Sequence, residues 1–202
     1  MVLRSRGVEV VTTREPGGTA TGERIRQLLL DVRTAGLDSY AELALMFASR
    51  AQHLREVILP ALAAGQIVLC DRFTDSSEAY QGGGRKLGSA PVLDLHRVLC
   101  GGLQPDLTIL MDSDVGSSVE RARRRNRDRS PEVADESRFE SENRAFFTRV
   151  HNAYLEIAKR EPQRVTRVDA RGTAEQTHAK IVDIVATRMN FHAEPGRTRN
   201  AG

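Results

Sequence analysis

The sequence predicts an α/β domain built around a doubly wound parallel sheet. Short runs of β-branched and other apolar residues alternate along the chain with longer stretches of helical periodicity. Alternation of strand and helix is typical of a parallel sheet that helices cover on both faces. The chain has 202 residues, 40% of them hydrophobic, which suits one domain with a substantial core.

Four runs are predicted to be buried strands, at residues 8–12, 67–70, 107–111 and 165–168. In open sheets of this kind, ligands bind beyond the carboxyl ends of the strands. The segments that follow the four strands are therefore the candidate binding segments, at residues 13–19, 71–85, 112–114 and 169–173.

The segments between the strands are predicted to be helices. The clearest begins at Ser39, where Glu42 three residues later completes a capping box, and extends to Gly65 with a disturbance at Pro60. The other predicted helices cover residues 22–32, 89–99, 115–124, 136–160 and 174–189. The domain is thus expected to cover residues 1–189, because residues 190–202 have little to bury and are predicted to be disordered.

The composition argues against several classes of protein. The only two cysteines, Cys70 and Cys100, form no metal-binding or disulfide pattern, and the histidines are scattered, so a reducing cytoplasm is expected. No apolar run reaches the roughly 18 residues that span a bilayer. The first residues lack the apolar region of a signal peptide, so no membrane partner is expected.

The first candidate binding segment, residues 13–19, contains two glycines that allow close backbone approach. Arg14 can make a bidentate contact with a phosphate there, although an ordinary surface turn is the alternative. Residues 17–22 match the GxxxxG spacing of a phosphate-binding loop, but Glu23 and Arg24 follow where Lys and Ser or Thr are required. A carboxylate would repel phosphate, so this motif is rejected.

In the second segment, the strand delivers Asp71 and Arg72 to the edge of the sheet. A carboxylate there can hold magnesium through water and a guanidinium can hold phosphate, whereas a salt bridge that caps the strand is the alternative. Residues 75–85 add hydroxyls, an amide, a phenol and a glycine-rich turn that ends in Arg85. This mixture suits hydrogen bonding to a base and a sugar.

The helix from Ser39 carries an arginine, Arg50, within its apolar stripe. The side chain either extends to the surface, or lies in a pocket and donates to a base carbonyl with Met46 or Phe47 against the ring. The stripe itself consists of Leu43, Met46, Phe47, Leu54, Val57, Ile58 and Ala61.

The formal net charge of +3 hides an uneven distribution of arginine. Many of the arginines lie in one short run at residues 121–129. If this run lies on a mobile flap, its arginines could close over transferring phosphates and neutralise their charge. A solvated helix face or a nucleic-acid patch would explain it equally well. Within residues 121–129 the run consists of Arg121, Arg123, Arg124, Arg125, Arg127 and Arg129.

Several motifs, taken together and in order, resemble those of bacterial thymidylate kinases. They are Thr-Arg-Glu-Pro-Gly-Gly-Thr at 13–19, Asp-Arg-Phe at 71–73, Ala-Tyr-Gln-Gly-Gly-Gly-Arg at 79–85, Pro-Asp-Leu-Thr at 105–108, Ser-Arg-Phe-Glu at 137–140, Arg-Val at 149–150 and Tyr-Leu at 154–155. The resemblance covers roughly residues 2–189. It implies the fold of P-loop nucleoside monophosphate kinases, phosphorylation of dTMP to dTDP with ATP and Mg²⁺, and a homodimer; nucleic acid is not expected as a partner.

The resemblance also implies roles for individual residues. Around dTMP, Arg14 and Arg72 would hold the phosphate, and Tyr80 would pack against the sugar. Asp71 would lie near the magnesium, bound through water. The full set implied for dTMP is Arg14, Glu15, Met46, Phe47, Arg50, Arg72, Ser77, Tyr80 and Gln81, of which Arg50, Ser77 and Gln81 would read the thymine.

For catalysis the resemblance implies arginines in a lid at about residues 121–140. The implied catalytic residues are Asp71, Arg72, Arg123, Arg125, Arg129 and Arg149. The implied ATP-binding residues are Arg121, Arg171 and Gly172.

The sequence departs from the family at several places. Met46 stands where the family usually stacks a phenylalanine on thymine, Ser137 begins the lid motif in place of aspartate, and His151 replaces a second arginine. The family also begins with a strand, a GxxxxGK[ST] loop and a helix, whereas residues 3–7 already resemble the end of that helix. The central strand and the P-loop are therefore expected to be absent from this chain, through a start that lies too late or a real loss.

Two rival functions remain open at this stage. One is a catalytically impaired protein that binds dTMP but cannot bind ATP. The other is a kinase for another nucleoside monophosphate.

Overall fold

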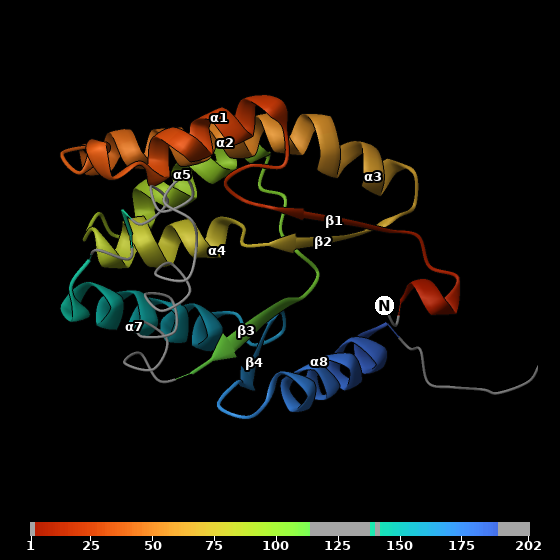
Figure 1. Cartoon of the computed structure of the whole chain (residues 1–202). Helices are drawn as coiled ribbons and strands as arrows, with labels where there is room; N and C mark the ends of the chain where they lie inside the picture. Colours follow the sequence, from red (N-terminus) through yellow and green to blue (C-terminus); the bar gives the residue numbers. More distant parts are fainter. Residues whose placement is uncertain (1–2, 114–137, 140–141, 190–202) are drawn as a thin grey trace, which may run out of the picture.

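The computed structural model describes residues 3–113, 138–139 and 142–189 (Figure 1). Its four described strands match the four predicted ones, and each ends one or two residues later than predicted. They are β1 (Val10–Arg14), β2 (Ile67–Asp71), β3 (Thr108–Asp112) and β4 (Val165–Asp169). Each strand therefore ends on a charged residue at the edge where ligands are expected.

The strands are parallel, as predicted, but they form two separate pairs. β1 pairs with β2 and β3 pairs with β4 (Figure 1). No ladder joins the pairs within the described part of the chain, so the single sheet expected from the sequence is not observed there. β2 and β3 carry exposed apolar side chains: Leu69 on β2 is 39% exposed and Met111 on β3 is 61% exposed.

The helices follow the predicted order with shifted ends. They are α1 (Ala20–Leu30), α2 (Ser39–His53), α3 (Leu59–Ala63), α4 (Thr74–Ser77), α5 (Ser89–Cys100), α7 (Arg144–Arg160) and α8 (Ala174–Arg188). Short 3₁₀ turns lie at η1 (Arg4–Arg6) and η2 (Val32–Thr34). The predicted helix at 115–124 and the tail 190–202 lie outside the described residues. No described helix is long and apolar enough to cross a bilayer.

The long helix predicted from Ser39 consists of α2, a π-helical segment η3 (Leu54–Ile58) and α3. The irregular part lies in the turn before Pro60, because proline has no N–H to donate to that turn. The predicted capping box is wrong. Asp38 is the N-cap and accepts from the backbone N–H groups of Tyr40 and Ala41, at 2.9 and 3.3 Å.

Two other predictions are wrong, one on where a helix begins and one on which structure a segment forms. α7 begins at Arg144, capped by Asn143, whereas the helix was predicted from residue 136. The described residues Arg138 and Phe139 lie in a turn. Residues 78–84 form a π-helix, η4 (Glu78–Gly84), in place of a glycine-rich turn.

The glycines of η4 let α7 approach closely. A Cβ at Gly83 would lie 2.7 Å from the Cβ of Ala153, and one at Gly84 would lie 2.6 Å from the ring of Phe146. Arg160 of α7 then fixes the other end of η4, since it donates to both oxygens of Glu78 at 2.7 and 2.8 Å. This packing holds η4 against α7.

Candidate active site

The carboxyl ends of β1 and β2 meet at one edge of their sheet, as predicted. Arg14 is the register partner of Asp71, and the N–H of Glu15 donates to the carbonyl oxygen of Asp71 at 2.9 Å. Arg72 follows directly. Two segments that are 57 residues apart in sequence thus place their charged side chains together.

Arg50 lies in a buried ion pair. Its side chain is 3% exposed, and its Nε donates to Oε2 of Glu15, itself 2% exposed, at 2.6 Å. Nη2 donates to Oγ of Ser77 at 3.0 Å, and the guanidinium lies 4.6 Å from the ring centroid of Phe47. The alternative in which Arg50 extends to the surface is therefore wrong. A buried pair of this kind persists because each charge compensates the other.

The other oxygen of Glu15 contacts His53, which is fully buried. Nδ1 lies 3.0 Å from Oε1 of Glu15, and Nε2 lies 2.6 Å from Oγ1 of Thr13. A carboxylate only accepts, so Nδ1 of His53 carries a proton and donates to Glu15, while Nε2 shares a hydrogen bond with the threonine hydroxyl. The loop after β1 is thereby tied to the carboxyl end of α2.

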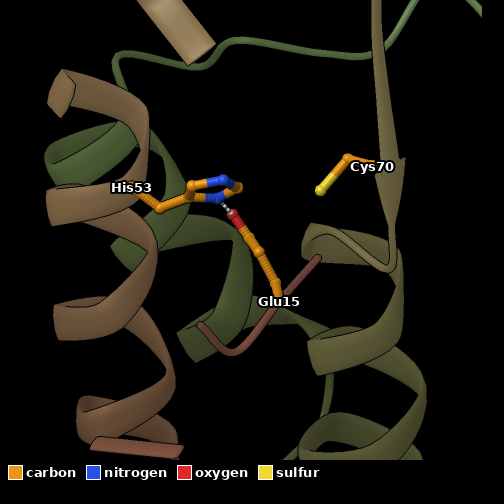
Figure 2. Close-up of side chains that lie close together, drawn as sticks. All are labelled: Glu15, His53 and Cys70. Carbon is orange, nitrogen blue, oxygen red and sulfur yellow. Dashed lines mark hydrogen bonds and ion pairs between the residues drawn. The ribbon is translucent and has the colours of Figure 1, made fainter. Parts of the chain in front are cut away.

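Cys70 of β2 lies close to the same two residues, and Figure 2 shows the three side chains converging from the loop, α2 and β2. Their ligand atoms lie within 4.8 Å of one another, which is compatible with a metal ion. The guanidinium of Arg50, however, already balances the charge of Glu15 and would repel a cation. Burial, and secondarily the charge of Glu15, raise the pKa of Cys70 to about 12, so it stays a thiol. We assign the cluster to holding the loop.

Glu23 also holds this loop. Its carboxylate accepts from the backbone N–H of Gly18 at 3.0 Å and from Nη2 of Arg14 at 3.1 Å. Burial alone would raise its pKa, but these bonds hold the pKa of Glu23 below its usual value. Glu23 therefore orients Arg14 at the edge of the site. It is also the residue whose charge argues against a phosphate-binding loop at residues 17–22.

Gly18 is the tightest point of the loop. Its φ is +80°, and an added Cβ would lie 2.6 Å from the imidazole of His53 and 2.7 Å from Oγ1 of Thr13. We expect Gly18→Ala to destabilise the fold by about 2 kcal/mol or more, because strain and overlap add. Urea unfolding measures this. Gly36→Ala is the matched control, since nothing lies within 4 Å of a Cβ there, and equal stability of the two variants would refute the expectation.

Nη1 of Arg50 and Oε1 of Gln81 are buried polar atoms that have no hydrogen-bond partner among the described residues. The Gln81 side chain is 0% exposed, and its Nε2 donates to Oε1 of Glu42 at 2.8 Å. Phe47 belongs to the core, so Met46, which is only partly buried, is the better placed of the two to contact a bound ring. One donor of Arg50 and one acceptor of Gln81 are therefore left without a partner among the described side chains.

Arg72 lies at the open side of the site. It has a left-handed backbone with φ of 70°, which is uncommon for a residue with a side chain and frequent at functional sites. Its guanidinium lies 5.0 Å from the ring centroid of Tyr80, while Asp71 is exposed beside it. Tyr80 is held edge-on by Phe146 and Tyr154. Burial raises the pKa of Tyr154 to about 12, so its hydroxyl stays neutral and donates to Ser76.

The remaining predicted residues are placed differently. Arg149 donates twice to the carbonyl oxygen of Gly84, at 3.1 and 2.8 Å, and so supports η4; its catalytic role stays a prediction. Arg171, next to Gly172, is exposed and pairs with Asp169. His151 bonds Asp112 at 2.8 Å, which lowers the pKa of that carboxyl. The predicted lid residues Arg121, Arg123, Arg125 and Arg129 lie outside the described residues.

The sequence analysis does not predict that Glu42 contacts Gln81 or that His53 contacts Glu15. The signal was present in α2, because Glu42, Met46 and Arg50 are spaced four residues apart and so share one face of the helix. His53 follows on the same face, three residues after Arg50.

Comparisons with known proteins agree on one family. The family model for thymidylate kinase matches residues 1–181. The thymidylate kinase of Desulfovibrio desulfuricans is 54% identical over 168 residues, which cover 83% of this chain and 77% of that protein. That of Pelobacter propionicus is 47% identical over 189 residues, covering 93% and 85%. The crystal structure of the Ehrlichia chaffeensis thymidylate kinase superposes with a TM-score of 0.69 at 29% identity, covering 91% of this chain and 84% of the other.

Proposed function

The chain belongs to the thymidylate kinase family, and we propose that it transfers the γ-phosphoryl group of ATP to dTMP, giving dTDP and ADP. In this reaction an oxygen of the dTMP phosphate attacks the γ-phosphorus in line and the bond to ADP breaks. No protein nucleophile is needed, because such transfers depend on positioning and on neutralisation of phosphate charge.

The observation that carries the choice of dTMP is the pair of buried polar atoms in the site. Nη1 of Arg50 is a donor and Oε1 of Gln81 is an acceptor. Thymine presents the complement along one edge, with O4 as an acceptor and N3–H as a donor. Cytosine presents the opposite pattern at both positions, so it would leave these buried groups unpaired, at a cost of about 1–3 kcal/mol each.

The phosphate of dTMP would lie at the ends of β1 and β2, where both Arg14 and Arg72 are exposed residues. Asp71 would hold Mg²⁺ through water, since its exposed carboxylate offers the oxygen donors that this ion prefers. The ion would neutralise charge on the phosphates. For ATP, we propose that the arginines at 121–129 and Arg149 neutralise charge on the transferring phosphate. Arg171 and Gly172 would contact the adenine.

The proposal is tested by an assay coupled to ADP formation, with dTMP, dUMP, dGMP and dCMP as acceptors. We expect turnover with dTMP and markedly less with dCMP. Calorimetry with dTMP and ATP separately addresses the rival function. Binding of dTMP without binding of ATP and without turnover would indicate a protein that only binds the nucleotide, and preference for another acceptor would indicate another monophosphate kinase.

We also propose that the chain is a cytoplasmic homodimer. Free Cys70 and Cys100 fit a reducing compartment. Val98 on α5 is 76% exposed, and Leu59 and Leu62 on α3 are 40% and 41% exposed, so both helices have apolar side chains that a partner would cover. Light scattering should give a mass of about twice 22.3 kDa, and a monomeric mass would reject the dimer.

A further inference from the structure

We propose that Glu42 is a positioning residue for base recognition, because it fixes which end of the Gln81 amide faces the base. The inference rests on the proposed function, in which Gln81 contacts thymine. Glu42 lies on α2 and is 0% exposed, and its Oε1 accepts from Nε2 of Gln81 at 2.8 Å. Glu42 itself does not need to touch the substrate.

The amide of a glutamine has two nearly isosteric orientations, one with oxygen and one with nitrogen toward a given neighbour. An ionised carboxylate accepts hydrogen bonds and donates none. Glu42 therefore selects the orientation in which Nε2 of Gln81 faces it and Oε1 faces away. That oxygen is the buried acceptor without a partner among the described residues.

Two arginines hold Glu42 in place and compensate its buried charge. Nη2 of Arg138 lies 2.7 Å and Nη2 of Arg85 lies 3.1 Å from Oε2 of Glu42. Arg138 also donates from Nε to the carbonyl oxygen of Leu29 at the end of α1, at 2.6 Å. Arg85 also pairs with Glu142. The carboxylate is thus fixed by elements on both sides of the site and cannot turn away from Gln81.

The orientation decides which pyrimidine fits. In the proposed function, Oε1 of Gln81 and Nη1 of Arg50 contact the same edge of the base, so the base meets an acceptor and a donor, which match N3–H and O4 of thymine. With the amide reversed, both protein groups would be donors. Thymine would then lose its N3–H contact, while cytosine would gain a partner for its N3 acceptor and still clash with Arg50 at its amino group. The ratio of the affinity for dTMP to the affinity for dCMP should therefore decrease, but dTMP should remain the preferred nucleotide.

Glu42→Gln tests this directly, because a glutamine at position 42 can donate to Oε1 of Gln81 and permits the reversed amide. By calorimetry with dTMP and dCMP, we expect the ratio of the two affinities to fall roughly tenfold or more, as follows from leaving one buried group unpaired. The ratio of dTMP to thymidine affinity should not change, because the described contacts of Glu42 are with Gln81, Arg85 and Arg138 and not with the proposed phosphate ligands Arg14 and Arg72. Glu42→Asp keeps a carboxylate and should retain most of the selectivity.

Glu142→Gln is the matched control: Glu142 pairs with Arg85, as Glu42 does, and its substitution should leave the dTMP to dCMP ratio unchanged. Thermal unfolding confirms that each variant is folded. If Glu42→Gln does not fold, Gln81→Leu takes its place: an unchanged ratio overturns the inference, because Gln81 would then have no part in the selectivity that Glu42 is proposed to set.

The two proposals fail in different ways. A wild-type protein that does not prefer dTMP to dCMP refutes the proposed function. A wild-type protein that prefers dTMP, together with a folded Glu42→Gln variant of equal selectivity, refutes the role of Glu42.

Discussion

Substitution of Arg50 by alanine is expected to cost about 3–5 kcal/mol of stability and to abolish measurable binding of dTMP. The stability loss arises because Glu15, 2% exposed, keeps a buried charge without its partner at 2.6 Å. Binding is lost because the donor Nη1 disappears and Ser77 loses the group that orients its hydroxyl. Urea unfolding measures the first effect and calorimetry the second.

Two further variants separate these effects. Arg55→Ala removes an exposed arginine five residues along the same helical stretch and should change neither quantity much. The double variant Arg50→Met with Glu15→Gln removes both buried charges, so it should recover much of the stability while dTMP binding stays lost. Recovery of binding in the double variant would show that Arg50 supports the loop only and does not contact the base.

The placement of the site was predictable from the sequence because it depends on local periodicity and on a general rule of topology. The apolar runs located all four described strands, and the carboxyl ends of parallel strands meet at one edge. The sequence therefore predicts that Arg14, Asp71 and Arg72 lie at one edge of the sheet. The strand register, which pairs Arg14 with Asp71, confirms that placement, and the roles of the three residues toward a ligand stay predictions.

The interactions inside the site were not predictable in the same way. Whether Arg50 is buried depends on Glu15, which is 35 residues away in sequence, and this contact requires the tertiary arrangement of α2 against the loop after β1. Glu42 was interpreted as half of a capping box, yet it is drawn into the core by two arginines, and Asp38 caps the helix. Local patterns identify which residues can form a bond, whereas burial decides which bond forms.

Arg72→Ala is expected to have the largest effect on the reaction. The guanidinium of Arg72 projects beyond β2 over Tyr80, and a charge-assisted bond to phosphate contributes about 1.5–3 kcal/mol. The affinity for dTMP should therefore fall by roughly ten- to a hundredfold, while the affinity for thymidine, which has no phosphate, should be nearly unchanged. Turnover should fall by orders of magnitude, because the same group positions the attacking oxygen.

The comparison of dTMP with thymidine makes this test specific. Arg97→Ala is the control, because Arg97 on α5 is 72% exposed and pairs only with its helical neighbour Asp94 among the described contacts. If Arg72→Ala weakened dTMP and thymidine equally, the side chain would act on the base pocket through Tyr80 and not on the phosphate. The phosphate would then have to be held mainly by Arg14, and Arg14→Ala should show the selective loss of dTMP affinity that we assign to Arg72.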